Sequence, residues 1–169
     1  MKIQSLSKKN LKETINLIKQ IFNSKDEDFD SPTKWLPASL NPDLKKSEEL
    51  YKNYNTIYLK YYVGIDEKSR KIIGVTGIYT REEDEKDSAW LPWYCVHPDF
   101  RGKGYGNMLV DFSIDLAKKM NKKYLKVYTS YNLDIKDAMS MYKKKGFKID
   151  KIENYPNTKE EMVFMSCKL

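Results

Sequence analysis

The sequence predicts an α/β (α+β) fold with about seven strands and about four helices. Short apolar or alternating runs, typical of strands, are interspersed with longer runs whose apolar residues recur every three or four positions, typical of helices. A loop with three glycines joins one such strand to one such helix. The elements follow one another in the order β-α-α-β-β-β-α-β-α-β-β.

The predicted strands are enriched in aromatic and β-branched residues. They cover residues 2–6, 57–65, 71–79, 89–96, 123–129, 147–153 and 161–169. The polar run 66–69 predicts a hairpin turn between the second and third strands. Pro92 lies within the fourth strand, and because proline has no N–H to donate to a sheet, it predicts an edge position or a bulge there.

The predicted helices cover about residues 8–22, 47–51, 105–120 and 134–145. Ser7 is suited to cap the first helix, and Asp134 to cap the last. Gly146 stands just past the end of the last helix, where a left-handed residue is common. Residues 23–43 contain three prolines and are expected to be irregular, and residues 81–87 form a charged, exposed connection.

Composition limits the class of protein. The chain has 169 residues, 40% of them hydrophobic, and shows neither a linker nor a repeat, so residues 1–169 are predicted to form a single domain. No apolar run approaches the roughly 20 residues that span a membrane, and the first residues lack the apolar segment of a signal peptide. We therefore expect a cytoplasmic protein that does not bind membranes.

The net charge of +7 raises the possibility of nucleic-acid binding. Only three of the 31 basic residues are arginine, and the lysines are interleaved with Asp and Glu. This pattern favours a lysine-rich surface without a nucleic-acid partner. Cys95 and Cys167 both lie in apolar runs and are expected to be buried thiols, not a disulfide. His97 is expected to be a solvated loop residue.

The loop 101–106, Arg-Gly-Lys-Gly-Tyr-Gly, has the composition of an anion-binding loop. Glycines allow the backbone to approach a ligand closely, and the unpaired N–H groups of a first helical turn point outward. The helix dipole and the charges of Arg101 and Lys103 favour an anion. Because a plain turn needs neither three glycines nor two cations, the loop predicts a phosphate or pyrophosphate site.

Spacing excludes two common phosphate-binding motifs. A Walker loop ends in Gly-Lys-Ser/Thr, whereas Lys103 is followed by Gly104. A dinucleotide fingerprint is Gly-x-Gly-x-x-Gly early in a βαβ unit, whereas this loop is Gly-x-Gly-x-Gly and lies past mid-chain. The pattern Arg-Gly-x-Gly-x-Gly after Val-x-Pro instead resembles motif A of the GNAT acyltransferase family, which binds the pyrophosphate of coenzyme A.

A second segment is similar to the same family. Ala138, Tyr142, Gly146 and Phe147 fit its pattern Asn-x-x-Ala-x-x-x-Tyr-x-x-x-Gly-Phe, with Ile135 in place of the asparagine. The resemblance extends over nearly the whole chain. It implies the GNAT acyl-CoA N-acyltransferase fold, in which helices flank a mixed central sheet.

The resemblance implies acetyl-CoA as cosubstrate and no metal. The residues that it assigns to cofactor binding are Cys95, Val96, Arg101, Gly102, Lys103, Gly104, Tyr105 and Gly106. Because Ile135 replaces the family asparagine, which often contacts the pantetheine arm, the nearby Asn132 is the candidate substitute for that contact. A bulge near Pro92 could expose backbone groups of Cys95 and Val96 to pantetheine and to the carbonyl oxygen.

The implied reaction is transfer of the acetyl group to a primary amine of a small molecule or peptide, by direct attack of the amine. Tyr142 is the candidate general acid for the leaving thiolate, because the family places a tyrosine near the CoA sulfur. The general base is left open among Asp87, Glu83 and an acid within 26–30 that acts through water. The resemblance is compatible with a monomer or a homodimer.

The acceptor pocket is expected to form from residues 24–37, the connection 80–88 and the last pair of strands, which all lie outside the cofactor motif. Acidic residues at 26–30 and 82–87 would favour a cationic amine there, although a solvated surface explains them equally well. The alternative function is a non-catalytic GNAT-fold module that binds acyl-CoA as a sensor or interaction domain. A basic nucleic-acid-binding domain is the third and least favoured reading.

Overall fold

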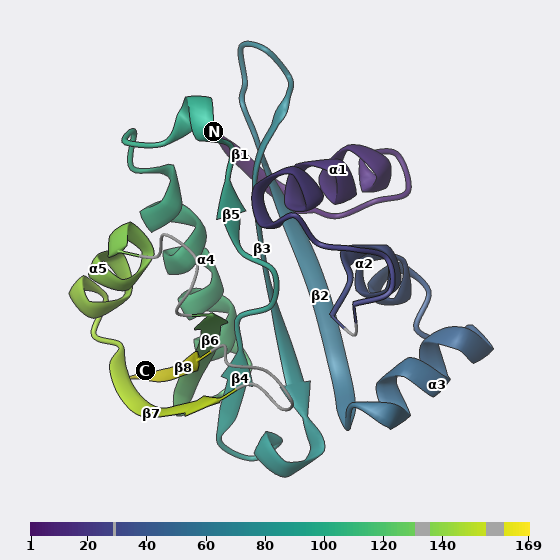
Figure 1. The fold of residues 1–169 in the computed structure, drawn as a ribbon, viewed down its shortest axis with the longest axis vertical. Coiled ribbons are helices and arrows are strands. Elements are labelled where there is room, and N and C mark those ends of the chain that lie inside the picture. The colour runs from purple at the N-terminus through teal and green to yellow at the C-terminus, as the bar shows by residue number, and fades with distance from the viewer. Residues whose placement is uncertain (29, 131–135, 155–160) are drawn as a thin grey trace.

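The computed structural model describes residues 1–28, 30–130, 136–154 and 161–169, and shows helices on both faces of one mixed sheet (Figure 1). The strands are β1 (Lys2–Ser5), β2 (Thr56–Ile65), β3 (Ile72–Arg81), β4 (Ser88–Trp90), β5 (Cys95–Val96), β6 (Tyr124–Ser130), β7 (Lys148–Asn154) and β8 (Glu161–Lys168). The helices are α1 (Leu11–Phe22), α2 (Pro32–Leu40), α3 (Lys45–Asn53), α4 (Tyr105–Lys119) and α5 (Lys136–Lys144). The predicted α/β (α+β) class is confirmed.

The strands follow the order β1-β2-β3-β4-β6-β8-β7, and β5 pairs with β3 beside β4. Within the described ranges, β4 and β6 are the only parallel pair, and the other neighbours are antiparallel. The hairpin predicted at 66–69 joins β2 to β3, and β7 pairs with β8 as predicted. None of the helices in these ranges has the length and apolar content that crossing a membrane requires.

Two clusters of buried side chains lie on opposite faces of the sheet. Leu17 and Ile18 of α1 and Leu36 of α2 pack on one face, against Val63 and Val75. On the other face the buried side chains come from α4, β6, β8 and the segment that follows α5. Figure 1 shows α1 and α2 on the side of the sheet opposite α4. The alternation of side chains along each strand supplies both clusters.

The predicted strand 89–96 is interrupted, which corrects its boundaries. β4 ends at Trp90 and β5 begins at Cys95, so residues 91–94 leave the sheet ladder. Pro92 lies in this break, packed so closely over Gly77 of β3 that a Cβ there would come within 2.8 Å of its Cγ. Of the two positions predicted for Pro92, the edge of the sheet is wrong, because β4 lies between β3 and β6.

The expected irregularity of residues 23–43 is also partly wrong, because α2 occupies Pro32–Leu40. Ser31 caps this helix by accepting a hydrogen bond from the Thr33 N–H, and Pro32 occupies a first-turn position that needs no N–H donor. Pro37 removes one internal hydrogen bond. The complete burial of Leu36 stabilises the helix despite this loss, which is a tertiary effect that local propensity does not contain.

The connection 81–87 is mostly exposed, as predicted, but one of its carboxylates is anchored. Asp84 accepts hydrogen bonds of 2.6 Å from both Trp90 Nε1 and Lys126 Nζ. Burial alone would raise the pKa of Asp84, but the hydrogen bonds from Lys126 and Trp90 outweigh it and hold that pKa below its usual value. The connection is therefore fixed to β4 and β6.

Candidate active site

The central feature of the site is a gap in the sheet between β5 and β6. β6 pairs with β4 as far as Trp90, and the Leu91 N–H still donates to the Lys126 carbonyl at 2.8 Å. Beyond that point β5 stays with β3, whereas the rest of β6 pairs with β8. The two halves of the sheet therefore separate after Leu91.

Backbone groups of β5 face this gap. The His97 N–H donates a hydrogen bond to the Ile73 carbonyl of β3, so His97 and Ile73 are a hydrogen-bonded pair of the antiparallel ladder. Because such positions alternate in an antiparallel ladder, Cys95 also bonds to β3, while Val96 directs its N–H and C=O groups away from it. The Val96 carbonyl accepts a hydrogen bond from Arg101 Nε at 3.2 Å. Val96 thus fits the predicted cofactor contact better than Cys95 does.

The glycine loop follows β5 directly and leads into α4. Gly102 and Gly104 have φ angles of +73° and +80°, which side chains rarely adopt. A Cβ at either position would meet nothing within 4 Å, so the loop borders open space. Gly104 is the N-cap of α4 and has no side chain to cap it, so the N–H groups of the first turn are left for a ligand or water.

Gly106 serves a different purpose from the other two glycines of the loop. Its φ is not left-handed, but a Cβ there would lie 2.6 Å from the Tyr94 hydroxyl. The same hydroxyl donates a hydrogen bond of 3.3 Å to the Met141 sulfur of α5. Gly106 therefore allows Tyr94 to lie between the start of α4 and α5, at the end of the gap.

Both cations of the loop are held beside it. Arg101 bonds to Val96 as described, and Lys103 Nζ donates to the Asp99 carbonyl at 3.1 Å. Lys103 also lies over the Phe100 ring, 4.9 Å from its centre. Their charge adds to the partial positive charge at the start of α4. The loop has the open backbone, the donors and the charge that an anionic phosphate group requires.

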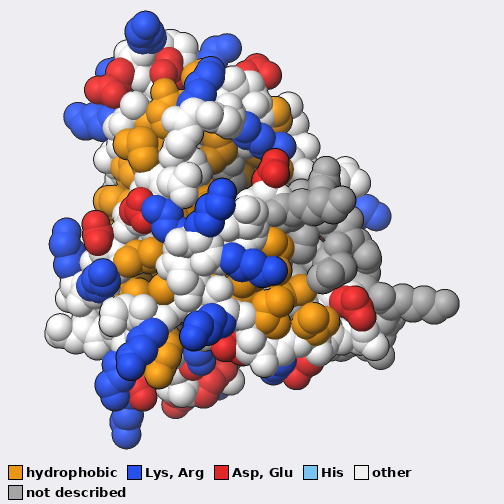
Figure 2. Space-filling view, turned by 90° about the vertical axis from the view of Figure 1, so that its left-hand side faces the viewer, with side chains coloured by type: hydrophobic (Ala, Val, Ile, Leu, Met, Phe, Trp, Pro, Cys, Tyr) orange, Lys and Arg blue, Asp and Glu red, His pale blue; other side chains and the backbone are white. Residues whose placement is uncertain are grey.

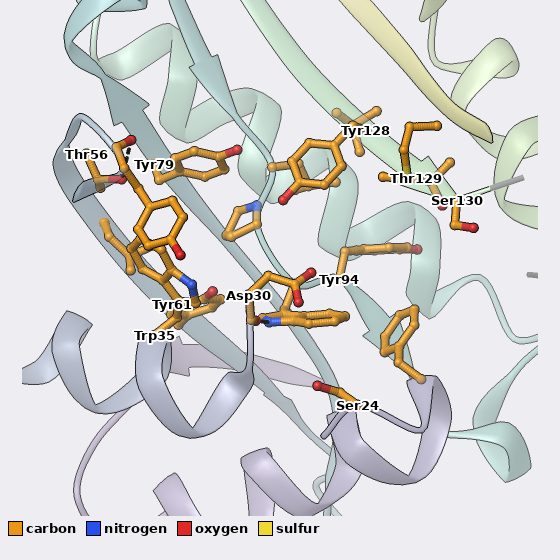
Figure 3. Close-up of a pocket in the computed structure, with 18 of the residues that line it drawn as sticks. Ser24, Asp30, Trp35, Thr56, Tyr61, Tyr79, Tyr94, Tyr128, Thr129 and Ser130 are labelled. Carbon is orange, nitrogen blue, oxygen red and sulfur yellow. Dashed lines mark hydrogen bonds between the residues drawn. The ribbon is translucent and has the colours of Figure 1, made fainter. Parts of the chain in front are cut away.

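A cavity of about 810 Å³ lies beside the gap, and side chains of both buried clusters line it. Figure 3 shows its polar and aromatic side chains converging from α2, the sheet and the segment before β5. The lining residues are Phe22, Ser24, Asp28, Asp30, Trp35, Tyr54, Thr56, Leu59, Tyr61, Tyr79, Arg81, Leu91, Pro92, Trp93, Tyr94, Val127, Tyr128, Thr129, Ser130, Tyr142 and Met162. All three segments predicted for the acceptor pocket contribute to this lining.

Tyr142 lines the cavity from α5 and is only 4% exposed. Its ring packs between Tyr94 and Phe147, with centroid distances of 6.0 and 5.3 Å. Burial raises the pKa of Tyr142 well above its ordinary value, with a smaller contribution from Tyr94. The residue therefore stays protonated at neutral pH and carries a proton next to the gap, so its role as an acid stays a prediction compatible with its position.

Asp30 is the carboxylate at the centre of the cavity (Figure 3). Burial is the main cause that raises its pKa, and nearby Asp28 adds to the effect, while its own backbone N–H and Lys34 oppose it. Asp28 also lines the cavity, but its Oδ2 accepts from the Lys25 N–H at 2.7 Å. Of the acidic run 26–30, Asp30 is therefore the residue best placed to meet an amine.

The other acids proposed for the base are directed elsewhere. Asp87 pairs with Lys123 at 2.9 Å, and Glu83 lies 3.9 Å from Arg81 Nη1 on the surface. Neither lines the cavity. Asp26, at the other end of the acidic run, pairs with Lys19 at 3.0 Å and is exposed.

The two cysteines are free and buried, as predicted. Burial raises the pKa of the Cys95 thiol to about 12, so this thiol is not a nucleophile at neutral pH. His97 is a loop residue, as predicted, and its Nδ1 accepts a hydrogen bond from the Asp99 N–H at 3.3 Å. Within the described ranges, no group of three or more His, Cys, Asp or Glu residues is arranged to hold a metal ion.

The structure thus places Tyr142 of α5 beside Tyr94 and within reach of the gap that the loop residues border. Asn132, Asp134 and Ile135 lie outside the described residues, so the proposed pantetheine contact and helix cap are not part of this geometry. Arg81 lies in the connection 80–88 predicted for the acceptor pocket, but the sequence did not single it out there. Its spacing of two from Tyr79 on β3 is the signal that could have found it, because such residues share a face.

Figure 2 shows the face of the molecule formed around α4 and α5. Basic side chains are spread over this face, with acidic and apolar side chains among them. The arrangement agrees with the interleaving of lysine and acidic residues in the sequence.

The fold corresponds to that of acetyltransferases. The profile of the Acetyltransferase (GNAT) family matches residues 19–147, which is most of the chain. The protein belongs to the GNAT acetyltransferase family, and its class is therefore that of acyltransferases. An uncharacterised N-acetyltransferase of Methanocaldococcus jannaschii is 31% identical over 64 residues, a match that covers 38% of this chain and 27% of that protein.

Solved structures agree on the fold. The ribosomal-protein-S18-alanine N-acetyltransferase of Escherichia coli superimposes with a TM-score of 0.67 at 16% identity, covering 99% of this chain and 92% of that one. A spermidine N-acetyltransferase chimera from Vibrio cholerae and hSSAT gives 0.67 at 17% identity, covering 99% and 96%. An aminoglycoside 6′-N-acetyltransferase solved with coenzyme A gives 0.67 at 13%, covering 99% and 97%.

Proposed function

We propose that this protein is an N-acetyltransferase that transfers the acetyl group of acetyl-CoA to a primary amine held in the cavity. The observation that carries the proposal is the gap between β5 and β6, which has an anion-binding loop at its α4 end and a cavity with a buried carboxylate beside it. This arrangement matches the two charges of the reactants, an anionic cofactor and a cationic amine.

The chain has residues that fit acetyl-CoA. The backbone N–H groups of the glycine loop, with Arg101 and Lys103, would hold its pyrophosphate. The outward C=O group of Val96 would accept a hydrogen bond from the pantetheine arm, which would lie along β5 as an additional strand would. Bound acetyl-CoA supplies the thioester carbonyl carbon that the amine attacks.

Asp30 would bind the acceptor as an ammonium ion and then accept a proton from it. Because its pKa is raised, this carboxylate is a stronger base than an exposed aspartate. The amine nitrogen then forms a bond to the carbonyl carbon, and the bond from that carbon to sulfur breaks. In becoming an amide the nitrogen loses two protons: Asp30 would take the first before the attack and release it to solvent, and would take the second as the bond to sulfur breaks.

Tyr142 would donate its hydroxyl proton to the sulfur that leaves, and would regain a proton from solvent when coenzyme A dissociates. Its high pKa means that it gives up the proton only as negative charge develops on sulfur. The outward N–H of Val96 would donate to the carbonyl oxygen as charge builds on it.

The test is release of coenzyme A thiol from acetyl-CoA with a panel of primary amines. Asp30→Asn should lower turnover roughly 10²- to 10⁴-fold, the usual scale for one general base. Asp115→Asn, an exposed aspartate on α4, is the matched control and should retain full activity. Saturable binding of acetyl-CoA without thiol release with any amine would contradict the catalytic proposal and support an acyl-CoA-binding module instead.

A further inference from the structure

Arg81, the last residue of β3, is the only cation among the described residues that line the cavity. Its guanidinium carbon lies 5.6 Å from the centre of the Tyr79 ring and 5.1 Å from that of Trp90. Stacking on rings holds a guanidinium by its face, while its N–H groups point outward in its plane. The two rings therefore hold Arg81 chiefly by contact with the face of its guanidinium.

Within the described residues, the N–H groups of Arg81 make no short hydrogen bond. Nη2 donates to the Tyr79 hydroxyl at a long 3.4 Å, and Nη1 lies 3.9 Å from Glu83, beyond hydrogen-bond distance. Nε is shielded from solvent and, among the described residues, has no hydrogen-bond partner. Nε is closed to a ligand as well as to solvent, so Nη1 and Nη2 are the donors that a ligand in the cavity would meet. Five donors in a fixed fork match a carboxylate, which accepts two of them at once.

Arg81 and Asp30 belong to different parts of the cavity. The sheet register pairs Arg81 with Thr56, and Figure 3 shows Thr56 and Tyr79 at one end of the cavity. Asp30 is at the centre, and Tyr94 lies on its other side, toward the gap. Tyr61, which is buried, lies between the Thr56 end and Asp30. The cavity thus contains an anionic site and a cationic site joined by an aromatic wall.

We infer that the acceptor is an amino carboxylic acid whose amine and carboxylate are separated by an apolar spacer. The carboxylate binds Arg81, the spacer lies along the tyrosine rings, and the amine meets Asp30 next to the gap. The inference rests on the proposed function for the fate of the amine, but the carboxylate site is a separate feature of the cavity. It gives the amine a fixed direction, because only one end of such a molecule suits each site.

The first test compares substrates in the unmodified protein. Thiol release is measured with glycine, with aminobutyrate, aminohexanoate and aminooctanoate bearing terminal amino groups, and with alkylamines of the same lengths. We expect one of the longer acids to exceed both glycine and its matching alkylamine in kcat/KM. Equal or better turnover of the alkylamines, or of glycine, would overturn the inference while leaving the acetyltransferase function standing.

The second test removes the guanidinium. Arg81→Gln should raise KM for the best amino acid roughly 10- to 100-fold, the scale of a hydrogen-bonded charge, and change that of the matching alkylamine little. Arg70→Gln, in the exposed turn before β3, is the matched control and should change neither. An equal loss for acid and alkylamine would mean that Arg81 only supports the fold, and would refute the carboxylate site.

Calorimetry separates the two proposals. Binding of the same acids is measured in the unmodified protein and in Arg81→Gln, without acetyl-CoA. Weaker binding in the variant supports the carboxylate site even if no amine is ever acetylated, which would contradict the proposed function alone. Equal binding in both proteins would refute the carboxylate site whatever the activity.

Discussion

Replacing Tyr142 by phenylalanine separates its chemistry from its packing. The ring lies between Tyr94 and Phe147, and both contacts are made by carbon atoms that phenylalanine retains. The change deletes one hydroxyl from the wall of the cavity. If the hydroxyl protonates the leaving thiolate, the loss falls on the transition state and not on the bound ground state.

A packing role and a catalytic role for the Tyr142 hydroxyl predict effects of different size in Tyr142→Phe. Loss of a single neutral hydroxyl changes the free energy of unfolding by about 1 kcal/mol. Loss of a general acid lowers kcat about 10²- to 10⁴-fold, which corresponds to about 3–5 kcal/mol of activation free energy. The melting temperature and acetyl-CoA affinity of Tyr142→Phe should therefore stay close to those of the unmodified protein while kcat falls.

The assay is steady-state thiol release from mildly acidic to mildly basic pH. Burial raises the pKa of Tyr142, so the unmodified protein should show no loss of activity from deprotonation of this residue in that range. Tyr94→Phe, which removes the neighbouring hydroxyl that bonds to Met141, is the control for general disturbance of the site. If Tyr142→Phe keeps the parent kcat at every pH, the residue is a packing residue and the acid assignment is refuted.

Three further predictions follow from other parts of the site. Gly104→Asp should abolish acetyl-CoA binding measured by calorimetry, because the carboxylate would repel the pyrophosphate. Gly104→Asn is the uncharged control; asparagine tolerates the φ of +80° at this position, so this variant should bind acetyl-CoA more weakly but measurably. Unchanged affinity in Gly104→Asp would exclude the loop as the cofactor site. Because the pKa of Asp30 is raised, its contribution to stability is fully present below its unfolded-state pKa and is lost as pH rises through its folded-state pKa. Asp30→Asn should therefore raise the melting temperature at neutral pH and lose this advantage in acid. A difference in melting temperature that does not change with pH would contradict the burial of the Asp30 charge. Asp84→Asn should lower the free energy of unfolding by roughly 1–2 kcal/mol in urea titrations, because it weakens the contacts to Trp90 and Lys126. Asp87→Asn breaks an exposed ion pair with Lys123 and should lower the free energy of unfolding by less. Equal losses in the two variants would show that the Asp84 contacts add no stability.

Local sequence patterns account for most of the secondary structure. Helix α4 and strands β2, β3 and β6 lie where the sequence pattern predicts them, because α4 has one apolar face and the strands are rich in β-branched and aromatic residues. The helix α2 was not predicted, since three prolines and a run of acids outweigh its propensity locally. Its formation depends on burial of Leu36 against the sheet, which is a contact with distant residues.

The loop 101–106 and its expected ligand class were determined by the sequence itself. Glycines at left-handed positions, adjacent cations and a helix start are all encoded within a few consecutive residues, so no long-range contact is needed to recognise them. Pro92 likewise predicted an irregularity in its strand, because proline has no N–H to donate to the ladder, but the full interruption between β4 and β5 was not predicted.

The cavity was decided only by the tertiary structure. Asp30, Arg81 and Tyr142 come from the segment before α2, the end of β3 and helix α5, and no local pattern relates them. Which carboxylate faces the gap depends on how that segment packs on the sheet, and the same packing leaves Arg81 Nε buried without an acceptor among the described residues. Burial and the separation of β5 from β6 are properties of the assembled fold, and together they create the raised pKa values and the paired charges that composition alone does not reveal.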